Sequence, residues 1–182
     1  MFTCVQNTVE LITIFTAFKA GTHENFMDNV TTNERFLTIL LVEDNPAHAE
    51  MVMRSFNLQD VTIHIQHVMD GEAALDYLNR RGSYHDSDAH PIPDIILLDL
   101  RLPKIDGFEV LQAIKAIPEL LGIPVIILTT SAAEKDINRA YQYHANSYLV
   151  KPIDFHRFVQ LMNDLGYYWL VWNQKSKKTT RN

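Results

Sequence analysis

Three acidic residues stand directly after aliphatic runs in this sequence of 182 residues. Asp99 follows the run 95–98, and the adjacent pair Glu43 and Asp44 follows the run 37–42. An ionised carboxylate at the end of a buried run is costly unless a cation lies beside it. Several carboxylates with room for water suit a hard, octahedral ion such as magnesium, which takes phosphate oxygens as further ligands. We therefore predict that Glu43, Asp44 and Asp99 form a Mg²⁺ site.

Hydroxyl and amine groups stand in the same position after other aliphatic runs. Thr129 and Thr130 end one run, and Lys151 follows another. Any one of these residues alone would most often be a helix cap or a solvated surface group. Because they occur together after different runs, a shared site explains them better, and in it Lys151 offsets the negative charge of Asp99. Asp106, within KIDGF, is instead expected to form a turn before a helix.

The aliphatic runs have strand length and alternate with helix-like segments. The five runs are LTILLV (37–42), VTIHIQHV (61–68), DIILLD (94–99), IPVIILTT (123–130) and SYLV (147–150). Most are continuously apolar, as strands covered on both faces of a parallel sheet are, whereas 61–68 alternates and is expected at an edge. The pattern predicts an α/β fold, a doubly wound five-stranded parallel sheet with right-handed crossovers. Ligands of such sheets bind beyond the carboxyl ends of the strands, where the residues above would meet.

Composition and short motifs exclude several classes of protein. The formal net charge of −6 lacks the broad positive field of a nucleic-acid-binding domain, so we expect no nucleic-acid partner. A single cysteine, Cys4, excludes an intramolecular disulfide and a multi-cysteine zinc cluster, and it suits a reducing cytosol. His64 and His67 are expected on opposite faces of a strand, where they make a poor metal pair. The apolar run 11–18 is too short to cross a bilayer and no Lys or Arg precedes it, so we expect a cytoplasmic protein without a membrane partner.

The pattern divides the chain into three parts. They are an N-terminal extension (1–35), a domain with the predicted sheet (36–165) and a C-terminal tail (166–182). Only 17 residues follow Leu165, too few for a DNA-binding or catalytic output domain. We therefore expect the domain 36–165 to act on its partners through its own surface.

The last predicted helix and the tail offer a surface for self-association. The helix DFHRFVQLMNDL (154–165) places Phe155, Phe158, Val159, Met162 and Leu165 on one face. Gly166 is expected to end this helix. The segment YYWLVW (167–172) then either folds back on its own core or forms an interface. We predict a homodimer through this helix and the segment 167–172.

Four motifs together make the segment 36–165 resemble the receiver domain of two-component response regulators. They are LLVEDNP, LLDLRLPKIDGFEVL, VIILTTS and YLVKP, in this order. The resemblance implies the receiver fold, in which Asp99 accepts a phosphoryl group from a phosphorylated histidine of a sensor kinase. It assigns Mg²⁺ to Glu43, Asp44, Asp99 and the backbone carbonyl of Arg101, with Asp44 the more direct ligand.

The same resemblance assigns roles around the phosphoryl group. Thr129 would donate a hydrogen bond to its oxygens and Lys151 would form an ion pair with them. Tyr148, together with Thr129, would form the conformational switch, and the peptide bond from Lys151 to Pro152 would be cis. A protein of this kind is a phosphoacceptor in signalling rather than an enzyme, since it catalyses only its own phosphorylation and dephosphorylation.

A finer likeness concerns the long segment RRGSYHDSDAHPIPD (80–94) and the aromatic tail. Both are similar to those of the small response regulators that serve bacterial and cyanobacterial phytochromes, which implies a phytochrome as the kinase. Arg101 departs from this group, whose members often carry Asn there, and Thr130 stands where many receivers have Ala or Gly. The Arg101 side chain can reach over the phosphoryl group or pair with Glu43, while Thr130 narrows access to that group, and we expect these features to lengthen the life of the aspartyl phosphate. The alternative is that Arg101 stabilises charge in the hydrolytic transition state and shortens that life.

Two other functions compete with a phosphoacceptor. A phosphohydrolase with an aspartyl nucleophile typically carries a second Asp two residues later as acid and base, but Arg101 holds that position. A receiver-like module can also dock proteins without being phosphorylated, although every residue needed for phosphorylation is present. Magnesium-dependent labelling of Asp99 separates the three functions.

Overall fold

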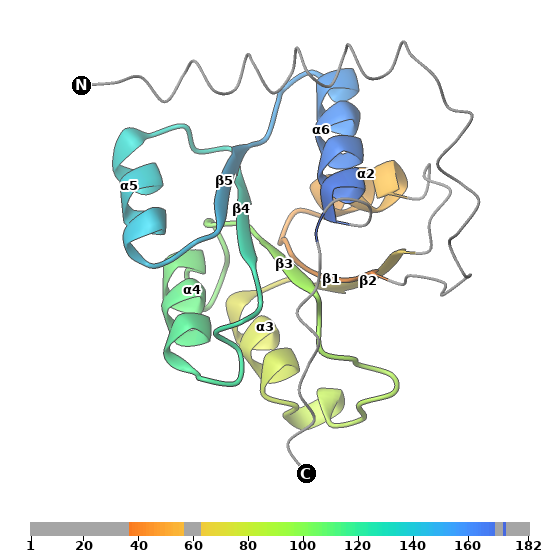
Figure 1. Ribbon diagram of the computed structural model, residues 1–182, viewed down its shortest axis with the longest axis vertical. Coiled ribbons are helices and arrows are strands. Elements are labelled where there is room, and N and C mark those ends of the chain that lie inside the picture. Colours follow the sequence, from red (N-terminus) through yellow and green to blue (C-terminus); the bar gives the residue numbers. More distant parts are fainter. Residues whose placement is uncertain (1–36, 57–62, 170–172, 174–182) are drawn as a thin grey trace. The chain divides into compact units, whose positions relative to one another are not determined.

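The computed structural model describes residues 37–56, 63–169 and 173. Its strands are β1 (Leu37–Val42), β2 (Ile63–Val68), β3 (Ile95–Leu98), β4 (Val125–Thr129) and β5 (Ser147–Val150). Its helices are α2 (Pro46–Phe56), α3 (Gly71–Leu78), the short 3-10 helix η1 (Gly82–Tyr84), α4 (Gly107–Ala116), α5 (Glu134–Gln142) and α6 (Phe155–Tyr167). The strands form one five-stranded parallel sheet in the order β2-β1-β3-β4-β5 (Figure 1). The predicted doubly wound α/β fold is confirmed.

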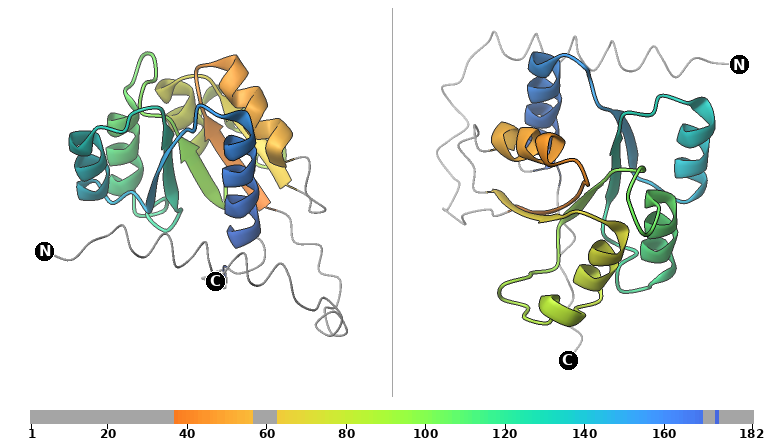
Figure 2. Two further views of the ribbon diagram at one scale, coloured as in Figure 1. Left: turned by 90° about the horizontal axis from the view of Figure 1, so that it is seen from above. Right: turned by 180° about the vertical axis from the view of Figure 1, so that it is seen from behind.

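Helices cover both faces of the sheet. α2 and α6 lie on one face, and α3, α4 and α5 lie on the other (Figures 1 and 2). Successive residues of a central strand therefore enter different cores, as Leu40 packs with residues of α3 and α4 while Leu41 packs with residues of α2 and α6. This double coverage explains the continuously aliphatic sequences of β1, β3 and β4. β2 lies at an edge of the sheet, as predicted from its alternating sequence.

α6 is the longest described helix, with 13 residues. The prediction that Gly166 ends it is wrong, because the helix continues through this buried glycine to Tyr167. A glycine inside a helix costs only about 1 kcal/mol relative to alanine, which packing of the helix on the sheet can offset. Phe158 and Met162 are buried as expected, whereas Phe155, in the first turn, is 51% exposed. No helix among the described residues is long and apolar enough to cross a membrane.

The turn after β3 brings the start of α4 against the end of that strand. Asp106 caps α4, since its carboxylate accepts a hydrogen bond from the backbone N–H of Phe108 at 2.8 Å and the Glu109 side chain accepts one from the N–H of Asp106. The turn predicted at Asp106 is thus confirmed. At the next position, a Cβ on Gly107 would lie 2.2 Å from the backbone oxygen of Asp99. Only glycine allows this close approach.

We expect Gly107→Ala to lower the free energy of unfolding by about 2 kcal/mol, because the two backbones must move apart to admit the methyl group. The same displacement shifts Asp99 and should slow any reaction at its carboxylate. Urea denaturation measures the loss of stability. Gly122→Ala is the matched control, since nothing lies within 4 Å of a Cβ at that position. Equal stability of the two variants would show that the approach of α4 to β3 is not tight.

Candidate functional site

The carboxyl ends of four neighbouring strands bring the predicted polar residues together. Glu43 follows β1 and Asp99 follows β3, while Thr129 ends β4 and Lys151 follows β5. Strand pairing fixes their relative positions, because Val42 pairs with Leu98 in the β1–β3 ladder and Thr129 with Val150 in the β4–β5 ladder. The side chains expected to share a site therefore meet at one edge of the sheet.

Three carboxylates form the acidic part of this site. One oxygen from each of Glu43, Asp44 and Asp99 lies within 4.8 Å of the others. Glu43 and Asp99 are buried, whereas Asp44 is more open to solvent. Oxygen ligands at this spacing fit a hard divalent cation that keeps some of its waters. The donor set thus agrees with a site for a divalent cation.

Lys151 is buried between two of these carboxylates. Its Nζ donates to Glu43 Oε2 at 2.5 Å and to Asp99 Oδ2 at 2.8 Å. Burial alone would raise the pKa of Asp99, but the hydrogen bond and charge of Lys151, with hydrogen bonds from Thr129 and from the backbone of Arg101, bring that pKa below its ordinary value. Asp99 is therefore ionised at neutral pH and carries the negative charge that a nucleophile or metal ligand needs.

The backbone that carries Lys151 differs from the expectation drawn from the receiver family. No cis peptide bond occurs among the described residues, so the bond from Lys151 to Pro152 is trans and the cis prediction is wrong. The trans form is the default for a bond before proline, by about 0.5–1 kcal/mol. From this trans backbone the amine still reaches both Glu43 and Asp99.

The side chain of Arg101 points to a partner that sequence reasoning missed. Its Nη2 lies 3.2 Å from Oδ2 of Asp136, in the first turn of α5. The prediction that Arg101 pairs with Glu43 is therefore wrong. Glu43 instead bonds Lys151 and contacts His48. The backbone N–H of Arg101 remains near the site, 3.3 Å from Oδ1 of Asp99.

The other predicted residues of β4 and β5 lie close to this ion pair. The Thr129 side chain is fully buried and hydrogen-bonds Asp99, whereas Thr130 is exposed. The Tyr148 hydroxyl donates to the backbone oxygen of Ser131 at 2.9 Å. Ser131 in turn donates through its Oγ to Asp136 Oδ2 at 2.6 Å. The segment after β4 thus connects the surroundings of Asp99 with Tyr148.

His48 is a second neighbour of the site that the sequence analysis missed. Its Nδ1 lies 3.1 Å from Glu43 Oε1 and 3.4 Å from the Nζ of Lys151. One ring nitrogen cannot donate to the carboxylate and accept from the amine at once, so the tautomer decides which contact is a hydrogen bond. One feature of the sequence indicated this role: His48 lies in the first turn of the helix that follows Glu43 and Asp44. His64 and His67, which the sequence analysis interpreted as structural, are not part of the group of possible metal ligands. His67 bonds the backbone oxygen of Glu43 at 2.8 Å.

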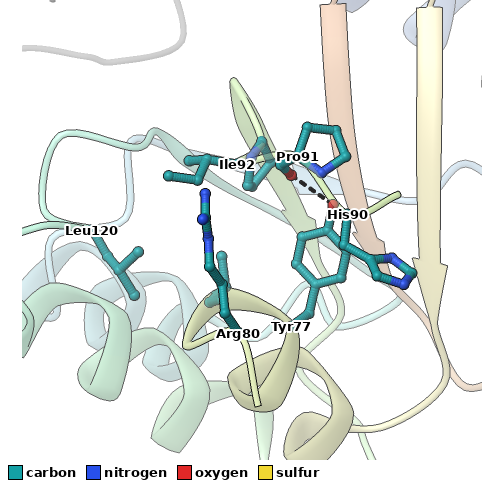
Figure 3. Close-up of a pocket in the computed structure, with 8 residues that line it drawn as sticks. Tyr77, Arg80, His90, Pro91, Ile92 and Leu120 are labelled. Atoms are coloured by element: carbon teal, nitrogen blue, oxygen red, sulfur yellow. Dashed lines mark hydrogen bonds between the residues drawn. The ribbon is translucent and has the colours of Figure 1, made fainter. Parts of the chain in front are cut away.

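A small pocket lies near the amino end of β3, at the end of the sheet opposite to Asp99 (Figure 3). It is lined by Tyr77, Leu78, Arg80, His90, Pro91, Ile92, Pro93 and Leu120. The Tyr77 hydroxyl donates to the backbone oxygen of Pro91 at 2.7 Å, and burial raises the pKa of Tyr77 to about 12, which keeps that proton in place. The rings of Tyr77, Tyr84 and His90 pack at centroid distances of 5.1 to 5.7 Å. These contacts anchor the long segment 80–94, and none of the predicted site residues lines the pocket.

A doubly wound sheet in the order 2-1-3-4-5, with an acidic pocket and a buried lysine at its carboxyl edge, defines the class of receiver domains. Residues 39–163 match the family described as response regulator receiver domain, and the chain belongs to this family. It is therefore a phosphoacceptor signalling protein of two-component systems, and membership implies a cognate histidine kinase.

Several known proteins are similar to this chain. It is 48% identical over 136 residues to the probable methanogenesis regulatory protein FilR2 of Methanothrix harundinacea, covering 75% of this chain and 85% of FilR2. It is 39% identical over 132 residues to the response regulator Rcp1 of Synechocystis sp., covering 72% of this chain and 88% of Rcp1. The crystal structure of the phosphorylated cyanobacterial phytochrome response regulator RcpA matches with a TM-score of 0.73 at 37% identity, over 77% of this chain and 98% of RcpA.

The comparison also bears on the acidic cluster. The Mn²⁺-bound form of Rcp1 matches with a TM-score of 0.72 at 36% identity, over 78% of this chain and 99% of Rcp1. The arrangement of Glu43, Asp44 and Asp99 is typical of the divalent-metal site of receiver domains.

Proposed function

We propose that this chain is a single-domain response regulator that accepts a phosphoryl group on Asp99 from a histidine of a sensor kinase. The observation that carries the proposal is a buried, ionised Asp99 held by Lys151 beside two further carboxylates. In the reaction, an oxygen of Asp99 attacks phosphorus and the bond from phosphorus to the histidine nitrogen breaks. The electron pair of that bond stays on the imidazole, and the product is an aspartyl phosphate.

The surrounding residues supply charge and position rather than covalent chemistry. We propose Glu43, Asp44, Asp99 and the backbone carbonyl of Arg101 as the groups that hold Mg²⁺, which would neutralise charge on the phosphoryl oxygens. The Lys151 amine would exchange part of its hydrogen bonding to Asp99 for hydrogen bonds to those oxygens. The Thr129 hydroxyl would donate a hydrogen bond to them. These groups follow or end different strands, so they neutralise the negative charge of the phosphoryl oxygens from several directions.

We further propose that Thr129 and Tyr148 form the switch that reports phosphorylation on the surface. Thr129 bonds Asp99, and Tyr148 bonds the segment that follows Thr129. A phosphoryl group that draws the Thr129 hydroxyl toward itself would pull this segment and release Tyr148 from its present partner. The signal would pass to a protein partner through this surface.

Labelling with a small phosphodonor tests the proposed function. Phosphoramidate with Mg²⁺ should give one stable phosphate per chain, and none should form in EDTA. Continuous release of phosphate without accumulation of label would indicate a phosphohydrolase, and absence of label in both conditions would indicate a docking module. Intact-mass measurement separates these outcomes.

For the kinase, we propose a phytochrome, acting in the cytoplasm. Likeness to Rcp1 and to RcpA, a phytochrome response regulator by its name, supports this choice. A second candidate, a sensor kinase without a phytochrome chromophore, is favoured by the likeness to FilR2, which is named for methanogenesis. Phosphotransfer from purified kinases of both kinds, followed over seconds to minutes, decides between them, because the cognate pair should transfer fastest.

For the assembly, we propose a receiver domain at 36–165 flanked by the extensions 1–35 and 166–182, and a homodimer through α6 and 167–172. Tyr167 and Tyr168 are 41% and 51% exposed, whereas Trp169 packs partly on the core, and 170–172 lie outside the described residues. Sedimentation velocity of the whole chain should show a dimer at micromolar concentration, and truncation after Gly166 should give a monomer with an unchanged phosphorylation rate. A whole chain that sediments as a monomer, phosphorylated or not, would assign the segment to the intramolecular core.

A further inference from the structure

Asp136 is a buried carboxylate outside the cluster of Glu43, Asp44 and Asp99. Its side chain is 9% exposed, although it lies in the first turn of α5, where acidic residues usually face solvent. Burial of a carboxylate is costly unless cations or hydrogen-bond donors surround it. Asp136 has two such partners, Arg101 Nη2 at 3.2 Å and Ser131 Oγ at 2.6 Å, and both bond the same oxygen, Oδ2.

The two partners of Asp136 come from the loops that enclose Asp99. Arg101 lies in the loop after β3, and its backbone N–H is 3.3 Å from Asp99 Oδ1. Ser131 lies in the loop after β4, and its N–H is 3.5 Å from the Oγ1 of Thr129, which itself bonds Asp99. Asp136 therefore ties together the loop after β3, which contacts Asp99, and the loop after β4, which contacts Thr129.

The arrangement restrains a side chain that would otherwise move freely. Arg101 is 63% exposed and has many rotamers, so without a fixed partner its guanidinium would sample a wide volume of solvent. A buried, preorganised carboxylate holds it in one place more effectively than an exposed one, because less water competes for the ion pair. Arg101 is thus fixed at the rim of the site between the loops after β3 and β4.

We propose that Asp136 is a positioning residue that sets the lifetime of the aspartyl phosphate by holding Arg101 across the approach of water. This inference rests on the proposed phosphorylation of Asp99. In hydrolysis, a water oxygen attacks phosphorus in line, the bond from phosphorus to Asp99 breaks, and its electron pair returns to the Asp99 carboxylate. The water loses a proton to solvent, and inorganic phosphate leaves. The bridge from Arg101 through Asp136 to Ser131 narrows the path of that water and slows the reaction.

Four variants of the full chain test this role: Asp136→Asn, Arg101→Gln, the double variant, and Glu134→Gln as control. Glu134 is an exposed acid in the same helical turn as Asp136, so its replacement removes the same charge without breaking the bridge. Each protein is labelled with phosphoramidate and Mg²⁺, freed of donor, and followed by intact mass. We expect Asp136→Asn and Arg101→Gln each to shorten the half-life about fivefold, and the double variant to match the single ones, because residues of one network are not additive.

The non-additivity separates positioning from a purely structural role, because a general loosening of α5 by Asp136→Asn would add to the effect of Arg101→Gln. A half-life in Asp136→Asn that equals or exceeds the wild-type value, or additive effects in the double variant, would overturn the proposal. If Asp136→Asn does not fold, Arg101→Gln removes the bridge from its exposed end, and an unchanged half-life there is equally decisive against it. Failure of the wild type to accept any label would instead refute the proposed function.

Discussion

Asparagine at position 99 yields a folded protein that accepts no phosphoryl group. The amide has the shape of the carboxylate but lacks its nucleophilic charge, and it removes one of the three negative charges within 4.8 Å that suit a divalent cation. Loss of a nucleophile lowers the rate of such reactions on the order of a thousandfold or more. Lys151 keeps its contact with Glu43 in this variant, so the buried amine is not left without a partner.

The label on intact protein, measured by mass after incubation with phosphoramidate and Mg²⁺, checks this result. Asp88→Asn is a suitable control, because Asp88 is an exposed carboxylate in the segment 80–94 at the other edge of the sheet. The control should label like the wild type, and circular dichroism should show the same helix content in all three proteins. If Asp99→Asn accepts as much phosphate as the control, another residue is the acceptor.

Methionine at position 151 is expected to destabilise the metal-free protein by about 3 kcal/mol, because it leaves Glu43 and Asp99 buried without the amine that bonds both. The same substitution should strengthen Mg²⁺ binding by about tenfold, or 1.4 kcal/mol, since the Lys151 amine then no longer repels the cation. The pKa of Asp99 should rise, because its lowering depends chiefly on Lys151.

Urea denaturation in EDTA and in saturating Mg²⁺ measures both effects for Lys151→Met. Mg²⁺ should restore much of the lost stability, because a ligand that binds only the folded state stabilises it in proportion to its affinity. Lys135→Met, which removes an exposed lysine from α5, should behave like the wild type in both buffers. A Lys151→Met protein that is as stable as this control in EDTA, or that binds Mg²⁺ more weakly, would argue against the charge balance described above.

The sequence predicted the fold and the position of the main side chains because both follow from local patterns. A continuously aliphatic run such as 95–98 is compatible with a strand buried on both faces, and the crossover rule then sends Asp99 to the same edge as Glu43. The turn at Asp106 followed from the residue types of a single short segment. These inferences needed no knowledge of side-chain directions.

The predictions that failed or were missing depend on contacts between distant segments. Nothing in the spacing from Arg101 to Asp136 indicates an ion pair, because the Arg101 side chain has several directions open to it and only packing of α5 selects one. His48 likewise reaches the site through the angle at which α2 leaves β1. Gly166 was expected to end α6 from its intrinsic tendency, but the chain packs on the core on both sides of that position, through Leu165 and Trp169.

The two edges of the sheet differ in how much change they tolerate. At the carboxyl edge the loops after β1, β3, β4 and β5 each carry a group within hydrogen-bond distance of Asp99 or of a residue that surrounds it, so an added residue there would displace a reacting atom. The segment 80–94 leaves from the other edge, and it is fastened near its ends by the hydrogen bond from Tyr77 to Pro91 and by the packed rings of Tyr84 and His90. The exposed stretch between these fastenings, around Asp86 and Asp88, can therefore lengthen at little entropic cost without moving the sheet. It is the place on the described part of the chain where a fluorophore or a peptide tag can be inserted to follow the phosphorylated protein while its chemistry is left undisturbed.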